Sequence, residues 1–174
     1  MAWACRKAPL KRILRYYTTL SNLLCAVGAL AVAVCRLAGT APQWVLVLKY
    51  VGTVSVTVTM LTVFFFLAPH AGFKELLSEQ DFFLHLLCPV LALVSHFLWD
   101  RPDAPFGIVW LGVLTVVLYG IVYLYKVLKA PEEQRWKDFY GFNTNGLWKV
   151  SYICMTVAAA VMQRLFPFFG VARV

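Results

Sequence analysis

Residues 43–67 read QWVLVLKYVGTVSVTVTMLTVFFFL, and this stretch decides the fold class. From Val51 to Thr59 apolar and polar residues alternate, which is typical of a half-buried strand. The run nevertheless stays apolar for about 25 residues, and a helix needs about 20 to cross a bilayer. A lone strand in lipid would leave its backbone groups without hydrogen bonds. The segment therefore predicts a transmembrane helix, whose Thr and Ser hydroxyls can bond to carbonyls of their own turn.

Four further apolar runs lie on either side of this segment. Together with it they predict five spans, at about residues 16–37, 43–67, 82–99, 106–128 and 147–168. Helix-breaking residues fall in the connections, namely Pro69, Pro102, Pro105, Pro131 and Gly141. We expect an all-α, polytopic transmembrane helix bundle that forms one domain over residues 16–168. A basic segment, 1–15, precedes it and a short tail, 169–174, follows.

The composition also indicates a membrane protein. The chain of 174 residues is 61% hydrophobic and only 14% charged, whereas soluble domains are about half apolar and about a quarter charged. A globule of this size cannot bury so much apolar surface, so membrane lipids are expected to solvate it. The net charge of +8 comes without any RNP, zinc-finger or basic-helix pattern, and no nucleic-acid partner is expected. The five cysteines form no CxxC pair, which predicts neither a disulfide framework nor a metal site.

The distribution of Lys and Arg predicts the orientation, because cytoplasmic loops are enriched in both. With the N-terminus in the cytoplasm, eleven basic residues lie inside and four outside. The inside set is Arg6, Lys7, Lys11, Arg12, Arg15, Lys74, Lys126, Lys129, Arg135, Lys137 and Lys149; the outside set is Arg36, Arg101, Arg164 and Arg173. Five spans then put the C-terminus outside, and we expect the cell membrane as the location.

Polar residues inside a bilayer are costly and face inward, so they are the candidates for function. In the first span Thr18, Ser21, Asn22 and Cys25 fall at i, i+3, i+4 and i+7, on one stripe of the helix. Such a stripe serves either as helix–helix contact or as part of a site. In the second span Lys49 either extends to the headgroups or faces an internal cavity and an anionic ligand.

The third span carries His85 and His96, which are about three helical turns, or ~16 Å, apart. They are too far apart to share a metal ion, and no second ligand has metal spacing from either, so no metal site and no cofactor is expected. Each is either a core histidine or a proton-handling group. Pro89 removes a backbone donor and frees the carbonyl of His85, which predicts a local distortion there.

The connection from Asp138 to Gly146 reads DFYGFNTNG and is rich in aromatic residues for a solvated linker. It lies on the same predicted side of the membrane as Thr18 and His85. These two residues are about three and four residues into their spans, so their side chains are expected at a similar depth. We expect it to fold back as a lid, with Asp138, Tyr140 and Asn143 lining a pocket together with Ser21, Asn22 and Lys49.

Two short motifs resemble the androgen-induced membrane hydrolase family. Arg15-Tyr-Tyr-Thr18-Thr-Leu-Ser-Asn22 resembles the opening of one family helix, and His85-Leu-Leu-Cys-Pro89 resembles its intramembrane His segment. The resemblance covers about residues 15–99, with a looser similarity at 138–143. One difference is that family members commonly carry a helix before the Thr motif, where this sequence has fifteen residues.

The resemblance implies hydrolysis of lipid esters, notably fatty acid esters of hydroxy fatty acids. Thr18 would be the nucleophile, with Thr19 as the alternative, and His85 its base. Such chemistry is coherent, since a Thr hydroxyl needs a neighbouring base and Asn22 could donate to an oxyanion. Two other functions stay open. One is a small transport or ligand-capture subunit that binds its ligand with Lys49 and the tyrosine faces of the fourth and fifth spans, which carry Tyr119, Tyr123 and Tyr152. The other is a non-catalytic membrane scaffold. The sequence does not indicate an oligomeric state.

Overall fold

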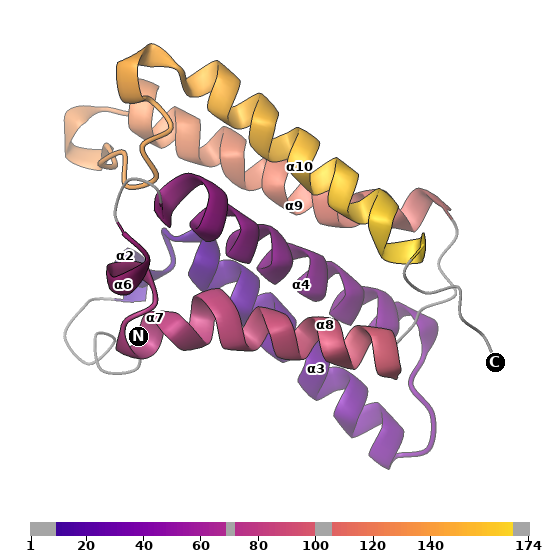
Figure 1. Cartoon of the computed structure of the whole chain (residues 1–174). Helices are drawn as coiled ribbons and strands as arrows, with labels where there is room; N and C mark the ends of the chain where they lie inside the picture. The colour runs from indigo at the N-terminus through magenta and orange to yellow at the C-terminus, as the bar shows by residue number, and fades with distance from the viewer. Residues whose placement is uncertain (1–9, 69–71, 100–105, 169–174) are drawn as a thin grey trace.

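The computed structural model describes residues 10–68, 72–99 and 106–168, and within these ranges the chain forms helices and loops without a strand (Figure 1). The all-α prediction is confirmed for this part of the chain. The major helices are α3 (Tyr17–Leu37), α4 (Gln43–Thr62) with a π-helical extension η1 (Val63–Leu67), α8 (Cys88–Leu98), α9 (Phe106–Leu124) with the extension η3 (Tyr125–Lys129), and α10 (Trp148–Phe168). The short elements are α2 (Leu10–Ile13), α6 (Phe73–Leu76), α7 (Glu79–Phe82), η2 (Phe83–Leu87), η4 (Glu132–Gln134) and η5 (Thr144–Gly146).

These helices begin and end within a few residues of the five expected runs. Some expectations fall outside the described residues, namely those for positions 1–9, for the tail 169–174, and for Pro69, Pro102 and Pro105.

Helix α4 lies at the centre and packs against α3, α8, α9 and α10. Every residue from Val51 to Thr59 is buried, so the alternation in this stretch does not mark an exposed face. The predicted back-bonding is confirmed: the Thr53 and Ser55 hydroxyls donate to carbonyls four residues earlier, at 3.0 and 2.8 Å. Thr57, Thr59 and Thr62 do the same. A side-chain hydroxyl that donates to a backbone carbonyl of its own helix needs no other partner, so it can be buried on any face of that helix.

Helices α3 and α4 are in near backbone contact. A Cβ atom on Gly28 would lie 2.7 Å from Lys49 Cα, and one on Gly52 would lie 2.6 Å from Cys25 Cα. Farther along, the Ser21 and Thr59 hydroxyls are hydrogen-bonded at 2.9 Å. Small and hydroxylated residues at a helix crossing allow this approach, so the stripe on α3 does serve as helix–helix contact.

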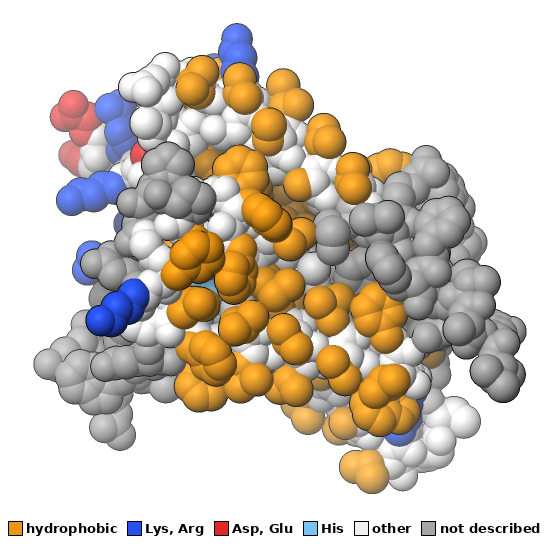
Figure 2. All heavy atoms as spheres, in the orientation of Figure 1, with side chains coloured by type: hydrophobic (Ala, Val, Ile, Leu, Met, Phe, Trp, Pro, Cys, Tyr) orange, Lys and Arg blue, Asp and Glu red, His pale blue; other side chains and the backbone are white. Residues whose placement is uncertain are grey.

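Three helices of the described chain are long and apolar enough to cross a membrane: Tyr17–Leu37, Gln43–Leu67 and Trp110–Lys129. Two shorter apolar helices cover Phe83–Leu98 and Trp148–Val161. Figure 2 shows a broad apolar face across the helices, while Lys and Arg gather mainly at the end near the loop between α9 and α10. An apolar face of this extent is what a lipid-solvated surface requires.

The segment that carries His85 departs from α-helical geometry, as Pro89 predicts. Residues Phe83–Leu87 form the π-helical turn η2, and α8 starts at Cys88 with Pro89 in its first turn. A π-helical turn widens the helix by one residue, and such turns are frequent at functional sites.

Candidate functional site

A small cavity lies where α3, α4, α9, α10 and the α9–α10 loop (residues 130–147) meet. Its volume is about 30 Å³, which is room for one or two water molecules at ~10–15 Å³ each. Apolar side chains line much of it, and the hydroxyl-bearing residues that line it are Tyr17, Thr18, Thr59, Thr62, Tyr119, Tyr140 and Tyr152. Residues from all four helices and the loop therefore line the cavity, and the surface that they expose to it is almost wholly apolar.

The Tyr140 phenol is placed against the N-terminus of α3. It accepts a hydrogen bond from the backbone N–H of Tyr17 at 2.9 Å, and it interacts with the hydroxyl and the backbone of Thr18. The first N–H groups of a helix have no partner within the helix, and Tyr140 supplies one from 123 residues away. Burial raises the pKa of the Tyr140 phenol, so it stays protonated at neutral pH.

Asp138 organises the loop that carries Tyr140. Its carboxylate accepts hydrogen bonds from the Tyr123 hydroxyl at 2.6 Å and from the backbone N–H groups of Phe142 and Asn143 at 3.0 and 2.7 Å. The N–H of Tyr140 in turn donates to the Tyr123 oxygen at 3.2 Å. One side chain of α9 and one carboxylate thus hold the loop in its folded-back position.

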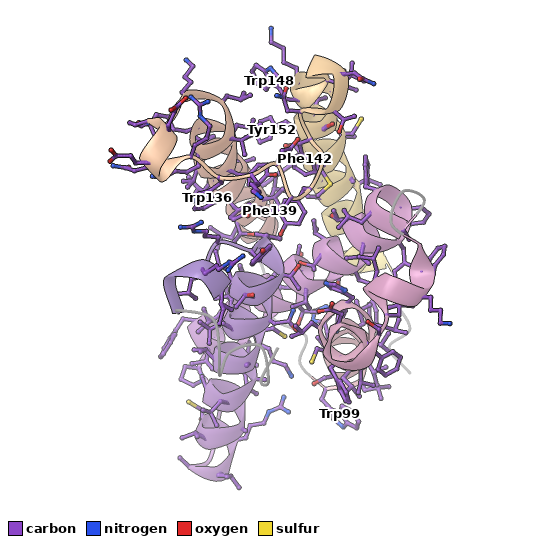
Figure 3. The ribbon with its side chains drawn as sticks, turned by 90° about the vertical axis from the view of Figure 1, so that its left-hand side faces the viewer. Trp99, Trp136, Phe139, Phe142, Trp148 and Tyr152 are labelled. Carbon is purple, nitrogen blue, oxygen red and sulfur yellow. The ribbon has the colours of Figure 1, made fainter. Side chains whose placement is uncertain are left out.

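Aromatic packing completes the attachment of the loop. Phe139 packs on Tyr16 and on Tyr123, with ring centroids 4.6 and 5.0 Å apart. Figure 3 shows Trp136, Phe139 and Phe142 together at the loop, near Tyr152 of α10, while Trp99 lies far from this group. Ring pairs at these distances contribute roughly 0.5–1.5 kcal/mol each beyond their buried area.

His85 is buried and hydrogen-bonded through Nδ1 to the carbonyl oxygen of Leu76 at 2.8 Å. Because a carbonyl only accepts, Nδ1 carries the hydrogen, and Nε2 is the basic nitrogen of the neutral ring. Asn22 links this segment to α3: its Nδ2 donates to the carbonyl of Thr18 at 2.8 Å and to that of Leu84 at 3.3 Å. Among the described residues, Thr18 and His85 have no hydrogen bond to each other.

Lys49 lies apart from the cavity. It is buried, and its Nζ donates to the Ser95 hydroxyl at 2.5 Å, so it is turned into the protein. Nearby, the ring of His96 packs on Tyr50, with centroids 5.5 Å apart. Lys49 precedes Thr59 by ten residues along α4, or ~15 Å. The second span therefore carries two separate polar regions.

Of the residues singled out from the sequence, Thr18 and Tyr140 line the cavity. Ser21 and Asn22 lie beside it as helix contacts, Asp138 supports the loop, and the backbone of Asn143 is one of the groups that Asp138 holds. Two further lining residues, Tyr119 and Tyr152, were expected at a site only in the ligand-capture alternative. Thr59 and Thr62 were not expected there at all. Their hydroxyls on an apolar helix were a signal, but nothing local distinguishes them from Ser55 or Thr57 of the same helix.

Comparison with protein-family models, with curated proteins and with solved structures finds no match to this chain. In the described part of the chain, no three His, Cys, Asp or Glu side chains lie close enough together to hold a metal ion.

Proposed function

We propose that the chain is a five-span membrane protein, with its N-terminus in the cytoplasm, that hydrolyses lipid esters with Thr18 as nucleophile and His85 as general base. The observation that carries the proposal is that the buried Thr18 lines a small cavity and that its hydroxyl lies beside a protonated phenol, that of Tyr140. The resemblance of the Thr18 and His85 motifs to a family of membrane hydrolases points to the same chemistry.

In the proposed reaction the Thr18 Oγ attacks the ester carbonyl carbon and its proton passes to Nε2 of His85. The carbon–oxygen bond of the ester then breaks, and the alcohol leaves with that proton. Water attacks the acyl–Thr18 ester, again with His85 as base, and releases the fatty acid. The hydrogen bond from Nδ1 to Leu76 holds the imidazole in the tautomer that this step needs. Because Thr18 and His85 have no direct hydrogen bond, the transfer uses one water or a shift of η2 towards α3.

Tyr140 is suited to stabilise the negative charge that develops on the carbonyl oxygen. Its phenol lies beside the Thr18 hydroxyl, and its raised pKa keeps the donor proton in place even above pH ~10, the ordinary value. A preorganised donor of this kind is typically worth about 10²–10³ in kcat. Tyr140→Phe should therefore lower kcat by about that factor and leave reactivity of Thr18 towards a covalent probe detectable.

Labelling with an active-site-directed fluorophosphonate tests the proposal. Thr18→Ala should reduce labelling of the purified protein to background, because the probe needs the nucleophilic oxygen. Thr19→Ala is the matched control, since it removes the same hydroxyl one residue along the helix. Labelling and ester hydrolysis should survive in this variant.

The result could contradict the proposal in two ways. Equal labelling of wild type and Thr18→Ala would exclude Thr18 as the nucleophile. Loss of labelling in Thr19→Ala but not in Thr18→Ala would identify Thr19 as the nucleophile instead. His85→Ala should lower labelling, and because it also removes the bond to the Leu76 carbonyl, it should lower the thermal unfolding temperature as well.

A second candidate, capture of an anionic ligand, is favoured by the buried ammonium of Lys49 at its contact with Ser95. A buried cation in a membrane protein is a site candidate in its own right. In that case decanoate should raise the unfolding temperature of wild type and of Thr18→Ala, but not of Lys49→Ala. Stabilisation that depends on Thr18 and not on Lys49 would instead favour the hydrolase.

A further inference from the structure

An open apolar groove runs between the C-terminal half of α4 with its extension η1 on one side and α10 on the other. Its volume is about 480 Å³, and no polar surface is exposed in it. On one side it is lined by Val58, Leu61, Phe65 and Phe66, and on the other by α10 from Ile153 to Val161. Each side spans nine residues, or ~12 Å of helix from the first to the last. The groove therefore has the shape of a slot along the helix axes.

The sizes of the two hollows set a limit on how a lipid can bind. The cavity at Thr18 has room for one or two water molecules and cannot enclose an acyl chain. The groove falls in the range of ~300–1,000 Å³ that small-molecule sites occupy. A lipid ester whose carbonyl reaches Thr18 must therefore place its chain outside the cavity, in a neighbouring apolar space.

The groove adjoins the cavity directly. Thr62 of α4 and Met155 of α10 line both hollows and so form the wall between them. The Thr62 hydroxyl donates to the Val58 carbonyl at 2.7 Å, and its oxygen lies 3.4 Å from the Met155 sulfur. A bond to a thioether is weak, and methionine changes rotamer easily. Rotation of one side chain would connect the two spaces.

We propose that this groove binds the acyl chain of a membrane lipid and that Met155 is the gate through which the ester carbonyl enters the Thr18 cavity. This inference rests on the proposed hydrolase function for its second half. The first half, chain binding between α4–η1 and α10, stands on the groove alone. A lipid would enter sideways from the bilayer, since the exposed Phe65, Val157 and Val161 place the groove on the outer surface of the helices.

Two substitutions on α10 provide a matched test. Val157 lines the groove and Val150, two turns earlier, does not; their exposed fractions are 54% and 55%. Tryptophan at position 157 should fill the groove, whereas tryptophan at position 150 adds the same bulk on the open surface. The protein is reconstituted into phosphatidylcholine vesicles that contain a trace of phospholipid with a diazirine on its acyl chain. Irradiation and peptide mass spectrometry then locate the cross-links.

The expected result is cross-linking concentrated on 153–161 and 58–66, which Val157→Trp reduces roughly tenfold and Val150→Trp leaves unchanged. Val157→Trp should also lower hydrolysis of a long-chain ester by a similar factor while hydrolysis of p-nitrophenyl acetate is kept, because acetate has no chain to place.

Even cross-linking over all exposed helix faces, or equal effects of the two tryptophans, would overturn the inference whatever the enzymatic result. If the groove is labelled as expected but wild type hydrolyses neither ester, the hydrolase proposal and the gate fail, and the chain-binding groove is supported. A Met155→Leu variant tests the gate. Because leucine is less flexible than methionine, this variant should keep groove labelling and lower only the hydrolysis of the long-chain ester. Unchanged long-chain hydrolysis would contradict the gate.

Discussion

Leucine in place of Gly52 should prevent α3 and α4 from assembling in their native register. A Cβ at this position would lie 2.6 Å from Cys25 Cα and 2.9 Å from its backbone nitrogen, so the obstacle is main chain that cannot rotate away. Overpacking costs about 1–3 kcal/mol, and more where the neighbour cannot move. Because α4 is the central helix, separating it from α3 also disturbs the cavity wall. We expect Gly52→Leu to lower the unfolding temperature strongly and to reduce the yield of folded protein in detergent.

Two further variants show whether backbone contact is the cause. Ala26→Leu adds bulk on the exposed face of α3 and should leave the unfolding temperature unchanged. Gly120→Ala should have an intermediate effect, because its Cβ would meet the ring of Tyr152 rather than a backbone. A Gly52→Leu protein that unfolds at the wild-type temperature would show that the two helices do not approach as closely as described.

Alanine in place of Asp138 should release the α9–α10 loop from the helices. The substitution leaves three donors without their acceptor: the Tyr123 hydroxyl and the N–H groups of Phe142 and Asn143. Hydrogen bonds to a charged acceptor contribute about 1.5–3 kcal/mol each, but water can replace part of this for a half-buried carboxylate, so we expect a loss of about 3 kcal/mol in total. Hydrogen–deuterium exchange of peptide 139–147 should accelerate while exchange in α4 stays slow.

The loop carries Tyr140, so its release has a second consequence at the site. The contacts of the Tyr140 phenol with Tyr17 and Thr18 would be lost together with the loop structure, and the proposed hydrolysis should fall at least as far as in Tyr140→Phe. Glu132→Ala and Glu133→Ala are the controls, since both carboxylates are exposed in the same loop. Unchanged exchange in Asp138→Ala would mean that the aromatic contacts alone hold the loop.

The local features of the chain were predictable because they depend on neighbouring residues. Hydrogen bonds between residues four apart build a helix, and the length of an apolar run limits where it can end. The strand-like alternation from Val51 to Thr59 was resolved correctly as a helix, since run length outweighs periodicity in a lipid-solvated chain. The departure from α-geometry around His85 also followed from one residue, Pro89.

The candidate site could be predicted only in part. Thr18 was selected from the polar stripe of its span and from the resemblance, and Tyr140 from the aromatic loop expected to fold back; both line the cavity. The expectation that Lys49 shares a pocket with them does not describe this structure, in which its ammonium contacts Ser95 at another level of α4. Thr62 and Met155, which separate cavity from groove, carried no signal beyond ordinary membrane-helix composition.

Taken alone, the residue pattern determined that the described chain is helical, where its helices lie and which of their side chains are polar. Only the tertiary structure decided that the Tyr140 phenol reaches the start of α3 at Tyr17. It also decided that an apolar groove adjoins the Thr18 cavity. The physical reason is one of range. Helix formation is encoded within a few turns, whereas these contacts depend on how closely α3, α4 and α10 approach, which the glycines at positions 28 and 52 and the shapes of facing side chains set jointly.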